Sequence, residues 1–256
     1  MRSSFLTLIF FFFFFLVNLI PAQNNFNFHQ FGDESKKFIS VPGKWNSNDL
    51  LKISLISAGS LLTMQVDEPI RNELMKNKDY SYSLPVELGR MYGDPISPLA
   101  LASAFGIYGV IQNDYSSKKI GFEIIQSALY STAVTVVLKM ALGRARPYNN
   151  LGSDSFFHAK LLDDAFLSFP SGHTTIAFSI STVLSKNAKG SLLKGLAFIP
   201  AAAAGFSRMY QDKHWASDVF LGAIIGYFTA EWVVNQHESA EQISQPVELV
   251  NIIIPL

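Results

Sequence analysis

The chain has 256 residues, a formal net charge of zero at pH 7 and no cysteine. A neutral chain gives no reason to expect electrostatic capture of nucleic acid, and the lack of cysteine excludes disulfide bonds as stabilisers. About 230 residues remain after an N-terminal leader, which is enough for one domain with a sizeable core. We find neither a nucleotide-binding glycine loop nor a zinc-ligand pattern.

Residues 1–22 have the layout of a secretory signal peptide. Met1 and Arg2 precede an almost uninterrupted apolar run from Phe5 to Ile20, and polar residues follow Ala22. Cleavage is expected after Ala22. Because Ile20 stands where alanine is more usual, an uncleaved anchor is the alternative.

A helical domain is expected over residues 49–235, between a polar lead-in with little regular structure over residues 23–48 and a C-terminal tail over residues 236–256. Apolar segments separated by stretches with Pro, Gly, Asn, Asp or Lys predict its helices. They cover Asp49–Val66, Pro98–Gln112, Ile120–Leu142, Thr174–Leu184, Leu192–Phe206 and Asp218–Val234. The predicted fold is therefore all-α, a helical bundle.

Three short stretches in the second half of the chain carry most of the residues with chemical potential. They are Lys139–Pro147 (KMALGRARP), Pro170–His173 (PSGH) and Ser207–Asp218 (SRMYQDKHWASD). Each falls at the end of a predicted helix, so all three can meet at one end of the bundle. The segment Tyr148–Ser168 is then expected to form a loop over that site.

The three stretches supply groups suited to a phosphoryl group in transfer. Lys139, Arg146 and Arg208 offer positive charge for the phosphoryl oxygens, whose negative charge must be stabilised. Ser171 and Gly172 precede a predicted helix, and the amides at a helix N-terminus favour anions. Gly172 also lets the chain approach a ligand closely.

Two histidines have the spacing for covalent catalysis. His214 and Asp218 lie four residues apart, which places them on one face of a helix. A carboxylate bonded to one imidazole nitrogen fixes the tautomer and leaves the other nitrogen free to attack phosphorus. His173 is then the candidate general acid for the leaving alcohol. This combination predicts phosphoryl transfer through a covalent phosphohistidine.

In their order and spacing, these stretches resemble the three signature motifs of the type 2 phosphatidic acid phosphatase and vanadium haloperoxidase superfamily. The matching positions are Lys139, Arg146, Pro147, the PSGH stretch, Ser207, Arg208, His214 and Asp218. The resemblance implies that His214 is the nucleophile, Asp218 its partner and His173 the acid. It also implies a set of phosphate-binding residues, namely Lys139, Arg146, Ser171, Gly172 and Arg208. No metal or other cofactor is implied for the phosphatases, whereas vanadate is the cofactor of the haloperoxidase branch.

Other residues near the motifs leave alternatives open. Arg144 is either a fourth phosphate contact or a solvated residue, and we favour a place behind the phosphate contacts. Three aromatic residues line either the substrate entrance or the core: Tyr148, Phe169 and Trp215. The other three histidines have no catalytic residue types near them in the sequence: His29, His158 and His237. Of these, only His158 is considered, as a residue at the edge of the site.

Two patterns bear on membrane insertion, and they favour opposite answers. Several predicted helices run only about 12 to 16 residues before a charge, short of the roughly 20 needed to span, which favours core helices or shallow insertion. Against this, Pro98–Gln112, Gly195–Phe206 and Val219–Phe228 are apolar on all sides, which suits lipid or complete burial.

The lysines favour one orientation in the membrane. Five lysines are expected in loops at the bundle end opposite the motifs: Lys118, Lys119, Lys186, Lys189 and Lys194. The positive-inside rule places these lysine-rich loops in the cytoplasm. The site would then face the periplasm or the exterior. If the leader exports the chain after it, the Asp49–Val66 helix cannot also span and is expected outside the bilayer or along its surface.

Three functions follow. The first is a metal-independent phosphatase for phosphorylated lipids or isoprenoid pyrophosphates in the cell envelope, because Gly143–Pro147 looks like the lipid branch of the superfamily. The second is a soluble periplasmic acid phosphatase of broad specificity for small phosphoesters, which the leader and the short helices favour. The third and most remote is a vanadium-dependent haloperoxidase.

Overall fold

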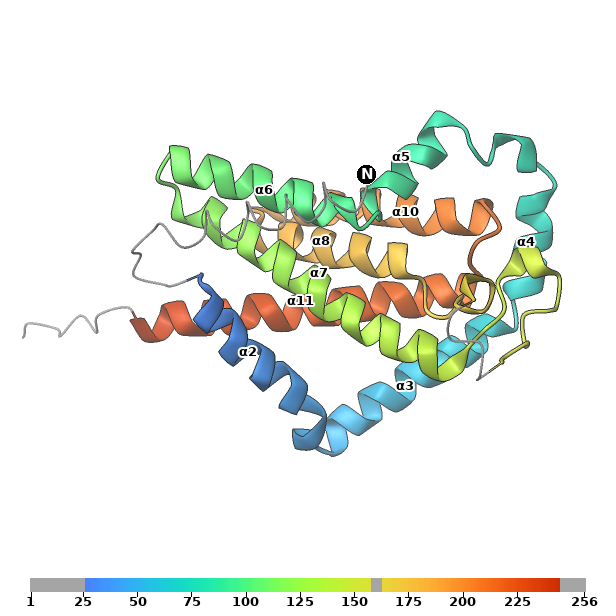
Figure 1. The fold of residues 1–256 in the computed structure, drawn as a ribbon, viewed down its shortest axis with the longest axis horizontal. Helices are drawn as coiled ribbons and strands as arrows, with labels where there is room; N and C mark the ends of the chain where they lie inside the picture. Colours follow the sequence, from blue (N-terminus) through green and yellow to red (C-terminus); the bar gives the residue numbers. More distant parts are fainter. Residues whose placement is uncertain (1–25, 158–162, 245–256) are drawn as a thin grey trace, which may run out of the picture.

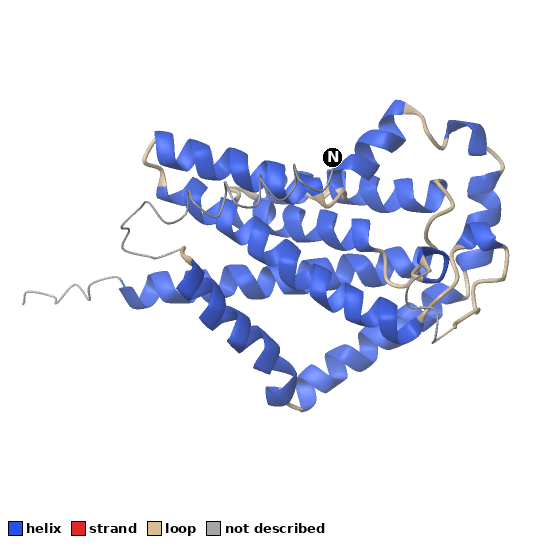
Figure 2. Ribbon diagram, in the orientation of Figure 1, coloured by secondary structure: helices blue, strands red, loops and turns tan. Residues whose placement is uncertain are grey.

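The computed structural model describes residues 26–157 and 163–244, and over these residues the chain forms helices and loops without a strand (Figures 1 and 2). This confirms the all-α prediction for the described part of the chain. The predicted signal peptide, residues 1–22, and the last part of the predicted tail, residues 245–256, lie outside the described residues.

The body of the fold is a bundle of helices that run side by side (Figure 1). Its members are α6 (Ile96–Ile111), α7 (Tyr115–Leu142), α8 (Gly172–Asn187), α10 (Ile199–Tyr210) and α11 (Ala216–Ser244). Small and branched apolar side chains fill the space between α6, α7, α8 and α11, among them Ile124, Ile180 and Val234, which are fully buried. Burial of this apolar surface is the main force that holds the bundle together.

Helix ends place the motifs. Gly143 caps the C-terminal end of α7, and its left-handed φ of 61° lets its amide bond back to Lys139 O at 3.0 Å. The chain therefore leaves α7 in a new direction just before Arg144. α8 begins after Ser171, whose side chain accepts from the Thr174 amide and caps the helix.

Glycines bring α11 close to α8. A Cβ on Gly222 would lie 2.6 Å from Ser171 O, and one on Gly226 would overlap Thr175 O and crowd Ser179 N at 2.9 Å. Only glycine fits at such backbone contacts. The N-terminal halves of α8 and α11, which carry two of the motifs, are thereby held against each other.

The N-terminal part of the chain is more ordered than the sequence predicts. Residues 23–48, expected to be a lead-in with little regular structure, contain α2 (Phe28–Ser40), η2 (Val41–Lys44) and the start of α3 (Ser47–Met64). Two further helices were not predicted, α4 (Asp67–Met75) and α5 (Leu84–Tyr92).

Polar side chains dock α2 on the bundle. Glu34 accepts from Gln126 Nε2 at 2.7 Å and pairs with His237 Nε2 at 3.1 Å, while Ser35 bonds to the hydroxyl of Tyr130 at 2.8 Å. Aromatic side chains of α2 pack beside these polar groups: the Phe38 ring stacks on Tyr130, and the Phe31 ring meets Phe122 edge-on. The docking face of α2 is therefore mixed, and the polar and charged residues between the two aromatic ones explain why this segment is not predicted as a helix.

Two helix boundaries differ from the prediction. The expected helix Leu192–Phe206 is broken into α9 (Ser191–Leu196) and α10, because Pro200 suits the first turn of a helix and cannot continue one. The predicted domain end at residue 235 falls inside α11. His237 lies within this helix and also pairs with Glu123 at 3.1 Å, which gives the polar extension a buried partner.

Among the described residues, two helices are long and apolar enough to cross a membrane, α7 and the Ala216–Glu238 part of α11. The pair α5 and α6, bent by 70°, is a third candidate if it counts as one span. α3 is not among these candidates, and its place outside the bilayer or along its surface stays a prediction. The lysines predicted in loops do lie at the end of the bundle opposite the motifs. Four of them belong to helices and not to loops, namely Lys118 and Lys119 in α7, Lys186 in α8 and Lys194 in α9.

Candidate active site

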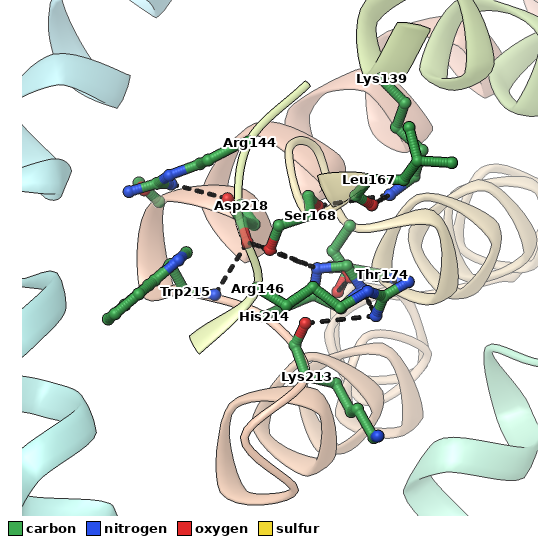
Figure 3. A network of polar contacts seen from close by, with 12 residues as sticks. Lys139, Arg144, Arg146, Leu167, Ser168, Thr174, Lys213, His214, Trp215 and Asp218 are labelled. Atoms are coloured by element: carbon green, nitrogen blue, oxygen red, sulfur yellow. Dashed lines mark hydrogen bonds and ion pairs between the residues drawn. The ribbon is translucent and has the colours of Figure 1, made fainter. Parts of the chain in front are cut away.

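The three motifs lie at helix ends on one side of the bundle, as predicted, and Figure 3 shows Arg144 and Arg146 of the first motif beside His214 and Asp218 of the third. Lys139 lies in the last turn of α7, Gly172 opens α8, and His214 stands in the connection between α10 and α11. Lys139 Nζ donates to Leu167 O and, at 3.3 Å, to Ser168 O, and its Cε would lie 3.9 Å from a Cβ on Gly172. The first and second motifs are thus in contact.

His214 and Asp218 form the predicted pair. His214 Nδ1 lies 3.4 Å from Asp218 Oδ2, a long hydrogen bond, and both side chains are almost completely buried. The same carboxylate oxygen accepts from the Trp215 amide at 2.8 Å and from the Ser168 hydroxyl. With Nδ1 facing the carboxylate, the other ring nitrogen, Nε2, is left for chemistry.

Arg146 lies beside that nitrogen. Its Nη1 is 3.5 Å from His214 Nε2 and 3.3 Å from Lys213 O. The rest of its guanidinium bonds to Asp164, with Nε 2.8 Å from the carbonyl and Nη2 2.6 Å from the carboxylate. Because the Asp164 side chain is 77% exposed, a bound anion can replace this ion pair at little cost.

Burial and nearby positive charge lower the pKa values of both histidines. Burial lowers the pKa of His214 well below its ordinary value, and nearby positive groups add to the effect: Lys139, Arg146, Arg208 and His173. Burial also lowers the pKa of His173, to about 4, and the charge of Arg208 acts in the same direction. The structure therefore gathers these predicted side chains closely enough to interact.

Of the three candidate phosphate-binding cations, Arg208 makes the fewest hydrogen bonds to the described protein groups. It is 6% exposed, its Nη1 donates to Gln211 Oε1 at 2.7 Å, and its buried Nε has no acceptor within residues 26–157 and 163–244. Burial, followed by the charge of Arg146, lowers its pKa to about 10. Because a buried donor without a partner is costly, an anion at this place would be stabilising.

The sequence predicts that the Ser171 amide faces an anion, but this amide donates to Asp218 O at 2.9 Å. The Ser171 hydroxyl accepts from Thr174 Oγ1 at 2.9 Å, and Ser171 as a phosphate-binding residue stays a prediction. The residue therefore ties the start of α8 to α11. Gly172 is the first residue of the helix and faces Lys139, in agreement with close approach to a ligand.

Arg144 lies behind the site, as we favoured. Its guanidinium is fully buried and bonds to Asp218 Oδ1 at 2.7 Å, to Asp67 and to Ser217. Trp215 and Phe169 are buried against it and belong to the core, whereas Tyr148 is 36% exposed and lies under Lys213 Nζ.

Several residues were missed or fall outside the site. Ser168, Ser217 and Asp67 touch Asp218 or its partners, and no spacing in the sequence singles them out. His29 is on the surface, and His158 lies outside the described residues. Among the described residues, no group of three or more His, Cys, Asp or Glu side chains has the arrangement of a metal site.

Comparisons with known proteins agree with the motifs. Residues 121–241 match the model of the PAP2 superfamily. The chain is 27% identical over 242 residues to a lipid A 1-phosphatase of Porphyromonas gingivalis, which covers 90% of this chain and 49% of that protein. It is 29% identical over 111 residues to an undecaprenyl-diphosphatase of Sulfolobus acidocaldarius, which covers 43% of this chain and 52% of that protein. The chain thus spans about half the length of the curated relatives it matches.

One solved structure supports the fold. A transmembrane PAP2-type phosphatidylglycerolphosphate phosphatase of Bacillus subtilis aligns with 73% of this chain and 96% of its own, with a TM-score of 0.51 and 16% identity. The helical bundle is therefore of the kind found in membrane phosphatases of this type.

Proposed function

We propose that the protein is a membrane-bound phosphatase that removes phosphate from phosphorylated lipids, because residues 121–241 match the model of the PAP2 superfamily. The observation that carries the proposal is the buried pair of His214 and Asp218, whose free imidazole nitrogen faces Arg146 among further cations. The names of the relatives, a lipid A 1-phosphatase and an undecaprenyl-diphosphatase, support a phosphomonoester or pyrophosphate of a lipid as substrate.

In the proposed reaction the phosphate binds between Lys139, Arg146 and Arg208, where positive charge stabilises the oxygens of the transition state. His214 Nε2 attacks phosphorus, the bond to the leaving oxygen breaks, and His173 gives that oxygen a proton. Asp218 stabilises the positive charge that the imidazole of His214 gains. A water molecule, which passes a proton back to His173, then releases phosphate from the histidine.

Exposed apolar side chains favour a lipid substrate over a small soluble ester. α6 and α7 carry many of them on their outer surfaces, where a water-soluble bundle would carry polar groups: Ile96, Ile107, Tyr108, Val110, Ile111, Leu129, Val136, Val137 and Met140. A membrane that covers these helices brings lipid headgroups to the bundle end that holds the motifs. The lysines at the opposite end favour a site that faces the periplasm or the exterior.

Phosphate release in detergent tests this proposal. The purified protein is given phosphatidic acid, undecaprenyl pyrophosphate and p-nitrophenyl phosphate in parallel, without divalent metal. We expect faster release from a lipid than from the soluble ester, and His214→Ala should reduce release by at least about 10³-fold.

The other outcomes separate the alternatives. Release mainly from p-nitrophenyl phosphate favours the acid phosphatase. Equal activity of wild type and His214→Ala contradicts the covalent mechanism, and no release from any substrate by a folded protein contradicts the phosphatase assignment.

A further inference from the structure

Asp67, the first residue of α4, lies behind the active site and before the region that matches the superfamily model. It is 1% exposed. Its Oδ1 accepts from the Ser217 amide at 2.9 Å, and its Oδ2 accepts from the Ser217 hydroxyl at 2.6 Å. Burying a carboxylate this deeply carries a large desolvation cost unless hydrogen bonds or an ion pair compensate it. Its contacts therefore indicate what Asp67 contributes to the site.

Arg144 connects this carboxylate to Asp218. One terminal nitrogen, Nη2, donates to Asp67 Oδ2 at 2.7 Å, and the other, Nη1, donates to Asp218 Oδ1 at 2.7 Å. Nη1 also bonds to Ser217 Oγ at 2.7 Å, and Nε bonds to Ser153 O at 2.8 Å. The planar guanidinium thereby fixes the two carboxylates relative to each other.

The surroundings keep Arg144 from turning. Three aromatic rings lie near its guanidinium carbon, at 5.4 Å for Phe156 and 5.6 Å for both Phe169 and Trp215. Cation–π attraction and close packing hold the guanidinium in one plane. With its donors bonded to protein groups, Arg144 serves Asp218 rather than the phosphate.

The charges in this chain of contacts do not cancel. Burial raises the pKa of Asp67, while its bonds to Ser217 and Arg144 oppose that shift. When both carboxylates are ionised, Asp67 and Asp218 share one guanidinium, so the group keeps one excess negative charge. Without Asp67, Arg144 would neutralise Asp218 and weaken its hold on the Nδ1 proton of His214. That hold selects the tautomer and stabilises the imidazolium character that develops when Nε2 binds phosphorus.

We propose that Asp67 is a positioning residue for the reaction, which acts through Arg144 and Ser217 to orient Asp218 and to keep its negative charge directed at His214. The inference rests on the proposed function, since it assigns the support of the same nucleophile. It also gives α4 a part in the site, although α4 contributes no group to the phosphate contacts.

Asp67→Asn tests this role because it removes the charge and keeps the shape. We expect kcat to fall about 10- to 100-fold, as when the support of a catalytic histidine is lost, with KM changed less than about threefold, because Lys139, Arg146 and Arg208 do not touch Asp67. A loss that lies mainly in KM overturns the proposal.

A matched control separates this effect from a loosened α4. Asp212 also anchors α4, through Arg71 at 2.7 Å, but touches neither Arg144 nor Asp218. Its φ of 56° suits asparagine, so Asp212→Asn keeps the backbone. We expect kcat close to that of wild type in this variant. An equal loss of kcat in both variants would mean that Asp67 only holds α4 in place.

A second readout does not depend on turnover. In ¹⁵N spectra of imidazole-labelled protein we expect His214 to carry its proton on Nδ1 in wild type and to show mixed tautomers in Asp67→Asn. An unchanged tautomer overturns the proposal even if no substrate is found, whereas an inactive wild type with the expected tautomer change counts against the proposed function alone. If Asp67→Asn does not fold, Ser217→Ala removes one bond to Asp67 and should lower kcat several-fold; an unchanged kcat in it counts against the proposal.

Discussion

His173 and His214 share one site, yet the proposed reaction needs them in opposite protonation states. His214 must be neutral to attack phosphorus, and burial keeps it so by lowering its pKa well below the ordinary value. His173 must carry a proton to release an alcohol, and burial, assisted by Arg208, lowers its pKa to about 4. The fraction of His173 in the imidazolium form therefore falls as the pH rises above that value. Turnover of substrates whose leaving group needs a proton should be faster at acidic pH.

We predict a pH dependence that differs between two substrates. From about pH 8 down to about pH 5, kcat/KM for an alkyl phosphate should rise relative to kcat/KM for p-nitrophenyl phosphate, whose leaving group needs no proton. The ratio cancels the titration of enzyme groups that act equally on both substrates. His173→Gln should flatten this ratio and lower alkyl phosphate turnover by about 10²- to 10⁴-fold, with a smaller loss on the aryl ester. Equal losses on both substrates would contradict the division of roles between the histidines.

At the scale of the elements, the contact between α8 and α11 holds two motifs together, and Gly226 is its tightest point. A methyl group there would overlap Thr175 O and crowd Ser179 N. Gly226→Ala should therefore lower the free energy of unfolding by about 1–3 kcal/mol, although alanine is the better helix former.

Thermal or denaturant unfolding in detergent measures this effect. Gly195→Ala is the matched control, because a Cβ at Gly195 in α9 meets nothing within 4 Å. That exchange should leave stability unchanged or raise it by up to about 1 kcal/mol. If the two variants unfold alike, the glycine does not set the approach of α11 to α8.

The elements predicted best are those with an apolar face. α6, α7 and α8 were found within a few residues, because their burial follows from hydrophobic pattern and from Pro and Gly at their ends. α2 is not predicted because its docking face mixes the aromatic Phe31 and Phe38 with the polar Glu34 and Ser35. No pattern in one sequence identifies Gln126 and His237 as the partners of Glu34. α4 is short and polar.

The site divides in the same way. His214, Asp218, Arg146 and Arg208 follow from motif spacing, because their roles need particular side chains at fixed intervals. The bonding of the Ser171 amide does not follow from motif spacing. Whether this amide faces a ligand or a neighbouring carbonyl depends on how α8 packs against α11.

For the whole molecule, the open question is which side of the membrane holds the site. The described helices include two candidate spans, and charge alone orients them, through lysines at the end opposite the motifs. Lys189 is exposed at that end, between α8 and α9. Lys78 is exposed at the other end, next to Asn77, whose carbonyl accepts from Tyr210 at the end of α10. These two positions report opposite faces.

Because the chain has no cysteine, Lys78→Cys and Lys189→Cys each carry a single thiol. In intact spheroplasts, a maleimide that cannot cross membranes should label Lys78→Cys at once and label Lys189→Cys only after the membrane is opened. The positive-inside rule predicts this order, since moving the lysine-rich end across the bilayer is unfavourable. The reverse order would place the site in the cytoplasm. Labelling of both positions in intact spheroplasts would show that the helices do not cross the membrane, and the soluble acid phosphatase would then become the better hypothesis.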